Sequence, residues 1–323
     1  MPEKPQISVV MPLYNKEKEV ERAIQSVLNQ TVSDFELIVV NDGSTDNSPK
    51  EVQGIKDHRI RLINQVNSGV SAARNRGVEE AQSDLIAFLD ADDEWMPDFL
   101  ETIFRLRDKF PACDVFATNY LYRSVDGTLM RPIIRGLPAS NWEGIFENYF
   151  AVASKSDPPI CSSAVAISKK AITFVGCFPV GITAGEDLIT WAKLALRFPI
   201  AYCSIPKAIF TLRASLSGKP TRLPDNEDLV GRSLENLLSE VPKVWLKDFE
   251  EYIALWHKMR AACFLRLGDG FEAKHEIAKM RRFSKRKLLW GIYAVCAYAP
   301  SSISMEIIKI LNRLKALRRS LFA

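Results

Sequence analysis

Repeated alternation of short apolar runs with helix-spaced segments is the feature that most constrains the fold of this 323-residue chain. Short apolar runs are typical of buried strands, and apolar residues every three or four positions are typical of helices packed on a sheet. The expected strands are Ile7–Met11, Phe35–Val40, Arg59–Ile63 and Leu85–Leu89, and the expected helices are Glu17–Asn29, Asp46–Lys56 and Ser68–Ala81. Such repeated units predict a parallel, doubly wound sheet over the first ninety residues.

Unusual polar residues follow each expected strand at its carboxyl end, the edge of an open α/β sheet where ligands bind. The segments are Pro12-Leu13-Tyr14-Asn15, Asn41-Asp42-Gly43-Ser44-Thr45-Asp46, Asn67-Ser68-Gly69 and Asp90-Ala91-Asp92-Asp93. Each has a structural alternative, because Asn15 and Asp46 could cap helices, Gly43 and Gly69 could form turns, and Tyr14 could be a core aromatic. Because all four segments follow strands at the same edge of the expected sheet, together they favour a binding site over these structural alternatives.

The acidic segment Asp90-Ala91-Asp92-Asp93 predicts a site for a divalent cation and a diphosphate. It follows the apolar run Leu85–Leu89, so a buried strand would deliver several carboxylates to one place. Like charges this close repel, and Mg²⁺ or Mn²⁺ bridging to phosphate oxygens would relieve the repulsion. The alternative is a solvated acidic turn that caps a helix beginning near Pro97.

The pattern changes after Asp114. Alternation predicts two antiparallel strands, and further segments predict a strand and a helix opened by Gly185-Glu186-Asp187. The strands are expected at Val115–Arg123, Thr128–Ile134 and Ile160–Ile167, and the helix at Leu188–Phe198. Beyond Ser217 the chain becomes helical and polar, which predicts a sheet domain at 1–217, a helical extension at 218–285 and a basic amphipathic tail at 286–323.

Charge is distributed unevenly along the chain. Residues 277–323 carry eleven Lys or Arg against one acid, a balance of +10, so the rest of the chain carries −6. This asymmetry favours a tail that meets an anionic surface over a nucleic-acid-binding domain. The six cysteines lack paired spacing, which argues against a zinc site or disulfide framework and favours a reducing cytosol. The histidines, His58, His257 and His275, are expected at the surface without a role.

The basic end is expected to associate with a membrane without crossing it. The apolar run Leu288–Ala299 has twelve residues, and a helix rising about 1.5 Å per residue cannot then cross a hydrocarbon core of about 30 Å. After Pro300, aliphatic and basic residues recur at helical spacing, which suits the surface of an anionic leaflet. The alternative is a helix packed on the catalytic domain or on a dimer partner. Because Met1–Gln6 is polar, we expect no signal peptide and a cytoplasmic location, peripheral on the inner membrane.

Taken together, the motifs resemble those of the family-2 inverting glycosyltransferases of the GT-A fold. The matching segments are ISVVMPLYNKEKEVERAIQSVLNQ, FELIVVNDGSTDNS, NSGVSAARNRG, LIAFLDADDEWMPD and GEDLITWAKL. They span roughly residues 5–200, and their order and spacing are specific as a set. The resemblance implies a Rossmann-like mixed α/β sheet flanked by helices, with a C-terminal helical extension.

The resemblance also implies roles for individual side chains. Tyr14 would stack on the donor base, and Asp42 would accept a hydrogen bond from the imide of uracil or thymine. Asp92, the second Asp of the D-x-D pattern, would ligate Mn²⁺ or Mg²⁺. In the catalytic pair Glu186–Asp187, Asp187 would be the general base, the alternative being that the pair only caps the helix. The nucleotide-binding candidates are Pro12, Tyr14, Asn15, Asp42, Arg74 near the diphosphate and Asp90 near the ribose.

The implied function is transfer of a sugar, with inversion, from a nucleotide-diphosphate donor to a hydroxyl group. A UDP-sugar is the expected donor, and a glycan or lipid-linked oligosaccharide of bacterial surface-polysaccharide synthesis is the expected acceptor. Many relatives carry a His after the next strand, whereas this chain has Phe210–Ser217 there, with Arg213 as the candidate replacement cation. The rival is a nucleotide-sugar-binding protein without turnover, which the intact acids disfavour. A dehydrogenase or nucleotidyltransferase is disfavoured because no G-x-G-x-x-G follows the first strand.

Overall fold

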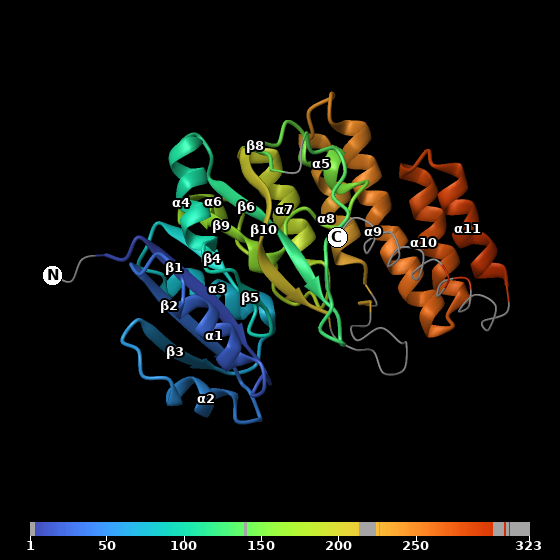
Figure 1. Cartoon of the computed structure of the whole chain (residues 1–323). Helices are drawn as coiled ribbons and strands as arrows, with labels where there is room; N and C mark the ends of the chain where they lie inside the picture. The colour runs from blue at the N-terminus through green and yellow to red at the C-terminus, as the bar shows by residue number, and fades with distance from the viewer. Residues whose placement is uncertain are drawn as a thin grey trace.

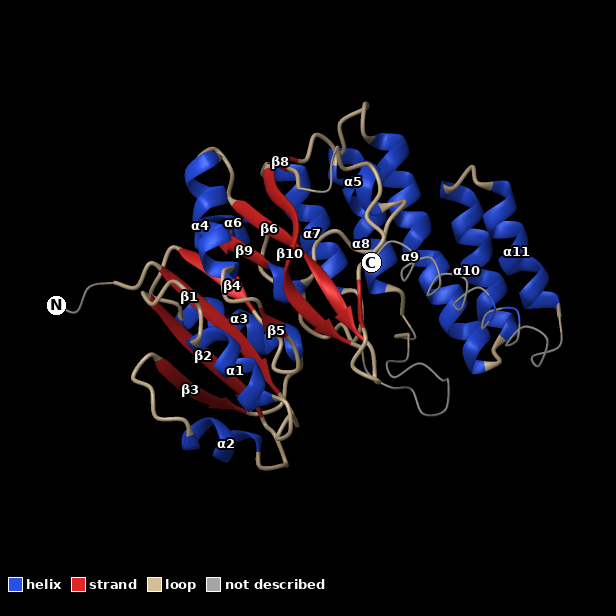
Figure 2. Ribbon diagram, in the orientation of Figure 1, coloured by secondary structure: helices blue, strands red, loops and turns tan. Residues whose placement is uncertain are grey.

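A ten-stranded mixed sheet forms the centre of the computed structural model, which describes residues 4–138, 141–212, 224–225, 227–299, 307 and 310. Figure 2 shows these strands in red with helices around them. The strands are β1 (Ile7–Leu13), β2 (Phe35–Asp42), β3 (Ile60–Gln65), β4 (Leu85–Phe88), β5 (Glu94–Trp95), β6 (Val115–Arg123), β7 (Leu129–Met130), β8 (Glu143–Ile145), β9 (Val165–Ser168) and β10 (Ile200–Thr211).

The strand order is β3-β2-β1-β4-β9-β6-β10-β5, with β7 beside β6 and β8 beside β10. β1 pairs in parallel with β2 and β4, and β2 pairs in parallel with β3. β9 lies antiparallel between β4 and β6. The parallel arrangement expected for the first four strands is therefore confirmed, and so is the mixed sheet as a whole.

Helices cover both faces of the sheet, which is why β1, β2 and β4 are buried along their whole length. Val9 and Met11 face one apolar core, and Val10 between them faces the other. The helices are α1 (Val20–Leu28), α2 (Ser48–Gly54), α3 (Val70–Glu80), α4 (Phe99–Lys109), α5 (Tyr149–Ala153), α6 (Lys169–Phe174), α7 (Glu186–Arg197), α8 (Leu229–Asn236), α9 (Leu246–Leu267), α10 (Gly270–Phe283) and α11 (Lys287–Tyr298).

A close approach of α3 to β1 depends on a glycine. A Cβ atom at Gly77 would lie 2.2 Å from Val10 Cγ1, far inside van der Waals contact. Glycine at this position therefore lets α3 sit against the strand whose carboxyl end forms part of the site.

Two expected strands are shorter in the structure. The segment expected to be extended over Thr128–Ile134 pairs only at β7, because Pro132 has no N–H to donate and the Ile133 N–H instead binds Asp157 Oδ2 at 2.9 Å. The first half of Ile160–Ile167 is a 3₁₀ turn, Ser162–Ala164, and only β9 is a strand. In both segments long-range contacts override the apolar pattern.

The chain after the sheet is helical, as expected. Helices α9, α10 and α11 lie at the end of the molecule opposite β3 and α2 (Figure 1). Apolar side chains of α7, α8 and α9 belong to one continuous core, among them Trp191, Leu234 and Ile253. The sheet and the helices are thus joined by packing, and the domain divisions at 217 and 285 remain predictions.

The apolar run expected at Leu288–Ala299 forms α11, which has twelve residues. In the described part of the chain no helix is both long enough and apolar enough to cross a bilayer. Apart from residues 307 and 310, the amphipathic segment after Pro300 lies outside the described residues, as does Arg213. Membrane association of the tail therefore stays a prediction.

Candidate functional site

Polar segments at the carboxyl ends of the first four expected strands meet in one cavity of about 540 Å³. Five of the predicted site residues line it: Pro12, Tyr14, Asp42, Asp90 and Asp92. The segment 181–183, which precedes α7, lines the same cavity from a distant part of the sequence. Parallel strand order thus brings together the segments that the pattern of polar ends singled out.

Tyr14 and Asp42 differ in how the fold holds them. The Tyr14 side chain is 47% exposed, so its ring is accessible beside the cavity. Asp42 is buried, and its carboxylate accepts hydrogen bonds from Gln65 Nε2 (2.7 Å), Ser68 N (2.9 Å) and Gly69 N (2.8 Å). A carboxylate has about four lone-pair positions, so Asp42 retains capacity to accept a bond from a ligand.

Asn15 joins two loops of the site. Its backbone is left-handed, with φ of 51°, and its Oδ1 accepts a hydrogen bond from Thr45 N at 2.8 Å. The Asn15 N–H donates to Ser44 Oγ at 3.1 Å. These contacts give Asn15 a part in holding the loops after β1 and β2 together, next to the lining residue Tyr14.

Lys16 is a site residue that the sequence reasoning missed. Its Nζ lies 2.8 Å from Asp92 Oδ2, and its side chain lines the cavity with Tyr14. Lys16 could have been predicted from its position in the loop directly after β1, at the edge of the sheet where ligands bind. Lys16 offsets part of the acidic charge at this edge of the sheet.

A second cavity of about 410 Å³ lies beyond the acidic segment. Arg74, Glu186 and Asp187 line this cavity, while Asp90 and Asp92 line both cavities. Other lining side chains include Tyr120, Tyr122 and Phe210 from β6 and β10. The two acids therefore stand at the boundary between a cavity with nucleotide-binding candidates and one with the catalytic candidates.

Arg74 is a buried bridge between two acids far apart in sequence. Its Nη2 lies 2.8 Å from Asp90 Oδ1, and its Nη1 lies 3.2 Å from Glu186 Oε1. Burial alone would lower the pKa of Arg74, but the charges of Asp90 and Glu186 raise it above its ordinary value. Arg74 thus stays charged and couples the acidic segment to the start of α7.

Glu186 and Asp187 are adjacent but lie in different surroundings. Glu186 is buried, and within the described part of the chain its Oε2 has no hydrogen-bond partner. Asp187 is half-buried in the wall of the second cavity, and its Oδ1 accepts a bond from Leu188 N at 2.8 Å. Glu186 is therefore placed to hold Arg74, whereas Asp187 is placed to meet a ligand.

Gly185 sets the direction from which α7 begins. Its φ is +90°, and an added Cβ would lie 2.6 Å from the indole ring of Trp256 on α9. The Trp256 Nε1 in turn donates to Asp228 Oδ1 at 2.8 Å. Trp256 of α9 therefore packs against the backbone directly before Glu186 and Asp187.

Asp93 anchors the acidic segment. Its two oxygens accept hydrogen bonds from Ser163 Oγ at 2.5 Å and from Thr211 N at 2.8 Å. Burial, together with the charges of Asp90 and Asp92, raises the pKa of Asp93 well above its ordinary value. Asp93 is thus placed to tie the acidic segment to the end of β10.

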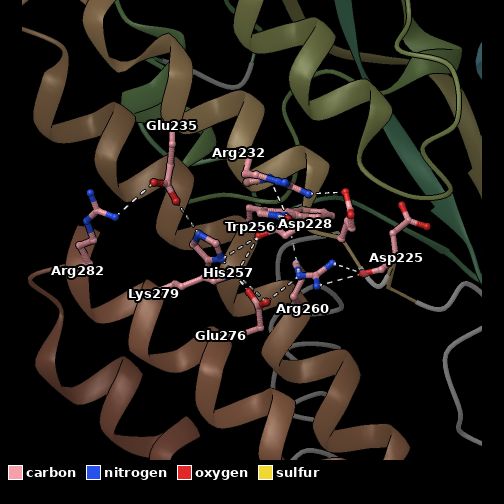
Figure 3. Close-up of polar contacts among 12 residues, drawn as sticks. Asp225, Asp228, Arg232, Glu235, Trp256, His257, Arg260, Glu276, Lys279 and Arg282 are labelled. Atoms are coloured by element: carbon pink, nitrogen blue, oxygen red, sulfur yellow. Dashed lines mark hydrogen bonds and ion pairs between the residues drawn. The ribbon is translucent and has the colours of Figure 1, made fainter.

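The expectation that all three histidines lie at the surface is wrong for His257. His257 is fully buried, and its Nδ1 lies 2.8 Å from Glu276 Oε2 (Figure 3). Single polar atoms of Asp228, His257 and Glu276 lie within 4.8 Å of one another, a spacing compatible with a metal ion. Asp228 caps the start of α8, His257 lies on α9 and Glu276 on α10, so sequence spacing could not reveal the cluster.

Two cations already occupy the surroundings of this histidine cluster. Arg260 Nε lies 3.1 Å from Glu276 Oε1, and Lys279 Nζ lies 3.5 Å from Asp228 Oδ2 and 3.4 Å from Glu276 Oε1. A divalent ion would therefore enter beside two positive charges. The cluster fits an ion-pair network that joins α8, α9 and α10 better than it fits a metal centre.

Glu276→Ala is expected to lower the free energy of unfolding by about 3–5 kcal/mol, because it leaves buried His257 and Arg260 without their shared carboxylate. Burial alone would raise the pKa of Glu276, but His257 and Arg260 lower it below its ordinary value. The contribution is therefore full above the ordinary glutamate pKa of about 4.3 and is lost as the pH falls below it. Urea unfolding near pH 7 measures the effect.

The exposed pair of Glu227 and Arg232 provides the control for this prediction. Glu227→Ala should change stability by less than about 1 kcal/mol, as exposed ion pairs contribute little. Equal stabilities of the two variants would contradict a structural role for the network.

Asp90 and Asp92 are better candidate ligands for Mg²⁺ or Mn²⁺ than the residues of the histidine cluster. Both line the two cavities with carboxylate oxygens, which these ions prefer. Each is also paired with a cation, Asp90 with Arg74 and Asp92 with Lys16, so what distinguishes them from the histidine cluster is that they border the cavities, where a diphosphate would share the ion. Burial raises the pKa of Asp93 most, and the charges of Asp90 and Asp92 raise it further; a cation would offset only the part that comes from these charges. The residues of the acidic segment therefore fit the predicted ion.

Residues 8–174 match the family profile "Glycosyl transferase family 2". An uncharacterized glycosyltransferase of Rickettsia felis is 31% identical over 238 residues, which cover 73% of this chain and 37% of that protein. Glycosyltransferase GlyA of Streptococcus pneumoniae is 33% identical over 144 residues, which cover 44% of this chain and 20% of GlyA. The match thus spans little more than a third of the length of the Rickettsia protein and a fifth of the length of GlyA.

The crystal structure of S. aureus TarS residues 1–349 in complex with UDP-GlcNAc has a similar fold. Its TM-score is 0.68 at 18% sequence identity, and the match covers 96% of this chain and 92% of that one. At this identity the likeness concerns the fold, and it includes the C-terminal helical part. The GT-A architecture predicted from the motifs is therefore confirmed.

Proposed function

Because the chain belongs to glycosyl transferase family 2, we propose that it transfers a sugar from a UDP-sugar to a hydroxyl group of a glycan or lipid-linked oligosaccharide, with inversion. One observation carries this proposal: Asp90 and Asp92 line both the cavity of Tyr14 and Asp42 and the cavity of Asp187. A nucleotide in the first cavity would place its diphosphate at these acids and its sugar in the second cavity.

The first cavity suits a pyrimidine nucleotide. The accessible Tyr14 ring provides a stacking surface, and Asp42 provides an acceptor for the imide N–H of uracil. The complex of TarS with UDP-GlcNAc supports a uridine donor for this fold. Pro12 lines the cavity beside Tyr14, while Asn15 would act by holding the loop.

The second cavity supplies the base for the reaction. The acceptor oxygen attacks the anomeric carbon as the bond from that carbon to the diphosphate breaks, and Asp187 takes the hydroxyl proton. UDP leaves with the bonding electron pair, and a single displacement inverts the anomeric configuration. Glu186 holds Arg74, and Arg74 holds Asp90, so the acids keep their relative positions during transfer.

A divalent cation, Mn²⁺ or Mg²⁺, completes the proposed site. Asp92 would hold it with Asp90 nearby, and Lys16 adds a positive charge at the same edge. When bound, the ion would offset the negative charge that grows on the departing diphosphate.

The proposed setting is bacterial surface-polysaccharide synthesis at the cytoplasmic face of the inner membrane. The excess of basic residues after Ile277 supports contact with an anionic leaflet. Such contact would bring the second cavity close to a lipid-linked acceptor.

A panel of nucleotide sugars tests the donor. In the presence of Mn²⁺, UDP-sugars at about 100 times Kd should add about 2.7 kcal/mol of stability and raise Tm by several degrees. GDP-sugars and ADP-sugars at the same concentrations should shift Tm much less, because adenine has no ring N–H from which Asp42 could accept a hydrogen bond and the larger ring of guanine places its N1–H further from the ribose than the uracil N3–H. Differential scanning fluorimetry measures the shifts, and release of UDP measures turnover.

The control is Tyr14→Ala, which removes an exposed ring that contributes little to folding. It should reduce the shift caused by UDP-sugars without lowering the Tm of the free protein. Equal stabilisation by all nucleotides would contradict the uridine assignment, and binding without any UDP release would favour a binding protein that does not turn over.

A further inference from the structure

A third cavity, of about 490 Å³, lies between the sheet and the C-terminal helices. Tyr122 and Pro158 line both this cavity and the second one, so the two cavities adjoin. Leu188, which directly follows Asp187, also lines it. The third cavity therefore adjoins the second cavity, which Asp187 lines, and shares no lining residue with the first cavity.

One stripe of α9 forms the longest wall of the third cavity. The residues that face it are Leu255, Lys258, Met259, Ala262, Cys263 and Arg266, which recur at the three- and four-residue spacing of one helix face. The remaining faces of α9 bury Ile253, His257 and Ala261 in the protein. The other faces of α9 therefore pack against the rest of the protein, and this stripe lines the cavity.

Charge in the third cavity is net positive. Its charged lining residues are Lys258, Arg266 and Asp157, two cations and one carboxylate, and all three also interact with other groups of the protein. Eight residues separate the two cations, so their Cα atoms are about 12 Å apart along α9. Two cations spaced in this way suit phosphate groups on an extended ligand, since ammonium and guanidinium groups bind phosphate oxygens.

Aromatic side chains complete the walls. Tyr122, Tyr149, Tyr252 and Tyr293 line the cavity from β6, α5, α9 and α11. Tyr122, Tyr149 and Tyr252 are almost fully buried, and the Tyr252 hydroxyl already donates to Leu188 O at 3.1 Å, so these rings contribute mainly apolar edges to the cavity. Apolar aromatic surface suits the C–H faces of sugar rings. The lining thus combines groups that fit sugars with groups that fit phosphate.

We propose that the third cavity binds the part of the acceptor that does not react, and that this acceptor is a glycan bearing phosphate. The inference rests on the proposed function, because an inverting transfer requires the acceptor to approach from the side opposite the diphosphate. The acidic segment separates the nucleotide cavity from the second cavity, and the third cavity continues on the Asp187 side.

Calorimetry with full-length protein, saturated with UDP and Mn²⁺, tests the proposal. The probes are N-acetylglucosamine, its 1-phosphate, and N-acetylglucosamine linked to farnesyl diphosphate. Both phosphorylated probes should bind at least about 10-fold more tightly than the neutral sugar. Tighter binding of the farnesyl probe than of the sugar phosphate indicates a lipid-linked acceptor, and equal binding indicates a phosphate-bearing glycan without lipid.

Variants of the lining residues test whether the probes bind in the third cavity. The double variant Lys258→Gln/Arg266→Gln should lose the preference for phosphate, and the matched double variant Lys243→Gln/Lys247→Gln, which removes two exposed charges elsewhere, should keep it. Ala262→Phe fills the cavity without changing charge and should weaken both phosphorylated probes about 10-fold or more. Unchanged Tm values confirm folding of each variant.

Equal binding of the neutral and phosphorylated sugars by the unmodified protein would overturn the proposal, as would a phosphate preference that survives in Lys258→Gln/Arg266→Gln. Failure of the donor function is detected separately, because it appears as absence of UDP-sugar binding in a titration without acceptor. That titration does not involve the third cavity.

Discussion

Asp187→Asn is expected to lower kcat by about 10²-fold or more while UDP-sugar affinity stays nearly unchanged. The amide has almost the same shape as the carboxylate, and its Oδ1 can still accept the hydrogen bond from Leu188 N. It cannot take the proton of an acceptor hydroxyl, so the loss falls on the chemical step. Steady-state release of UDP measures kcat, and calorimetry measures donor binding.

Asp108→Asn supplies a matched control, because Asp108 is an exposed acid on α4 whose contact is with neighbouring Arg107. That variant should retain normal turnover. Near-normal kcat in the Asp187 variant would remove Asp187 from the role of base, and a parallel loss of donor affinity would point to a binding role instead.

Asp92→Ala is expected to weaken Mn²⁺-dependent binding of UDP by about 10²-fold or more. Loss even of an outer partner of a metal ligand commonly costs 10- to 100-fold, and Asp92 is proposed as a ligand. Calorimetric titration of UDP with Mn²⁺ and with chelator separates the metal-dependent part of the affinity. The difference between the two conditions should be large in the unmodified protein and nearly absent in the variant.

Lys16→Met controls for the ion pair that Asp92→Ala also breaks, because it removes the cation 2.8 Å from Asp92 and leaves the carboxylate. It should preserve a difference between Mn²⁺ and chelator. The metal assignment fails if the unmodified protein binds UDP equally well in both conditions.

The edge of the sheet that carries the site was predictable because its signals are local. Parallel strands place their carboxyl ends together, so the segments after β1, β2 and β4 had to converge once the strands were recognised. Tyr14, Asp42, Asp90 and Asp92 were found in this way, and all line one cavity.

Contacts between distant segments were not predictable. Arg74 and Glu186 are 112 positions apart, and nothing in either segment indicates that the two side chains form a buried ion pair. His257 looked like a surface residue because its acidic partner Glu276 lies on the next helix. The strand expected up to Ile134 ends at Met130 for the same reason, because the Ile133 N–H donates to Asp157 instead of to a neighbouring strand.

The contact between Trp256 and Gly185 limits how this protein can be recombined. A chimera with its crossover at residue 217 would combine the half that carries the proposed nucleotide cavity with foreign helices, and Gly185 would then face whatever side chain replaced the indole. The first turn of α7, which carries Asp187, would lose its native support even though every residue that lines the first cavity was retained. Exchange of acceptor specificity between relatives therefore requires the crossover to lie beyond α9, or the replacement helices to bring their own tryptophan.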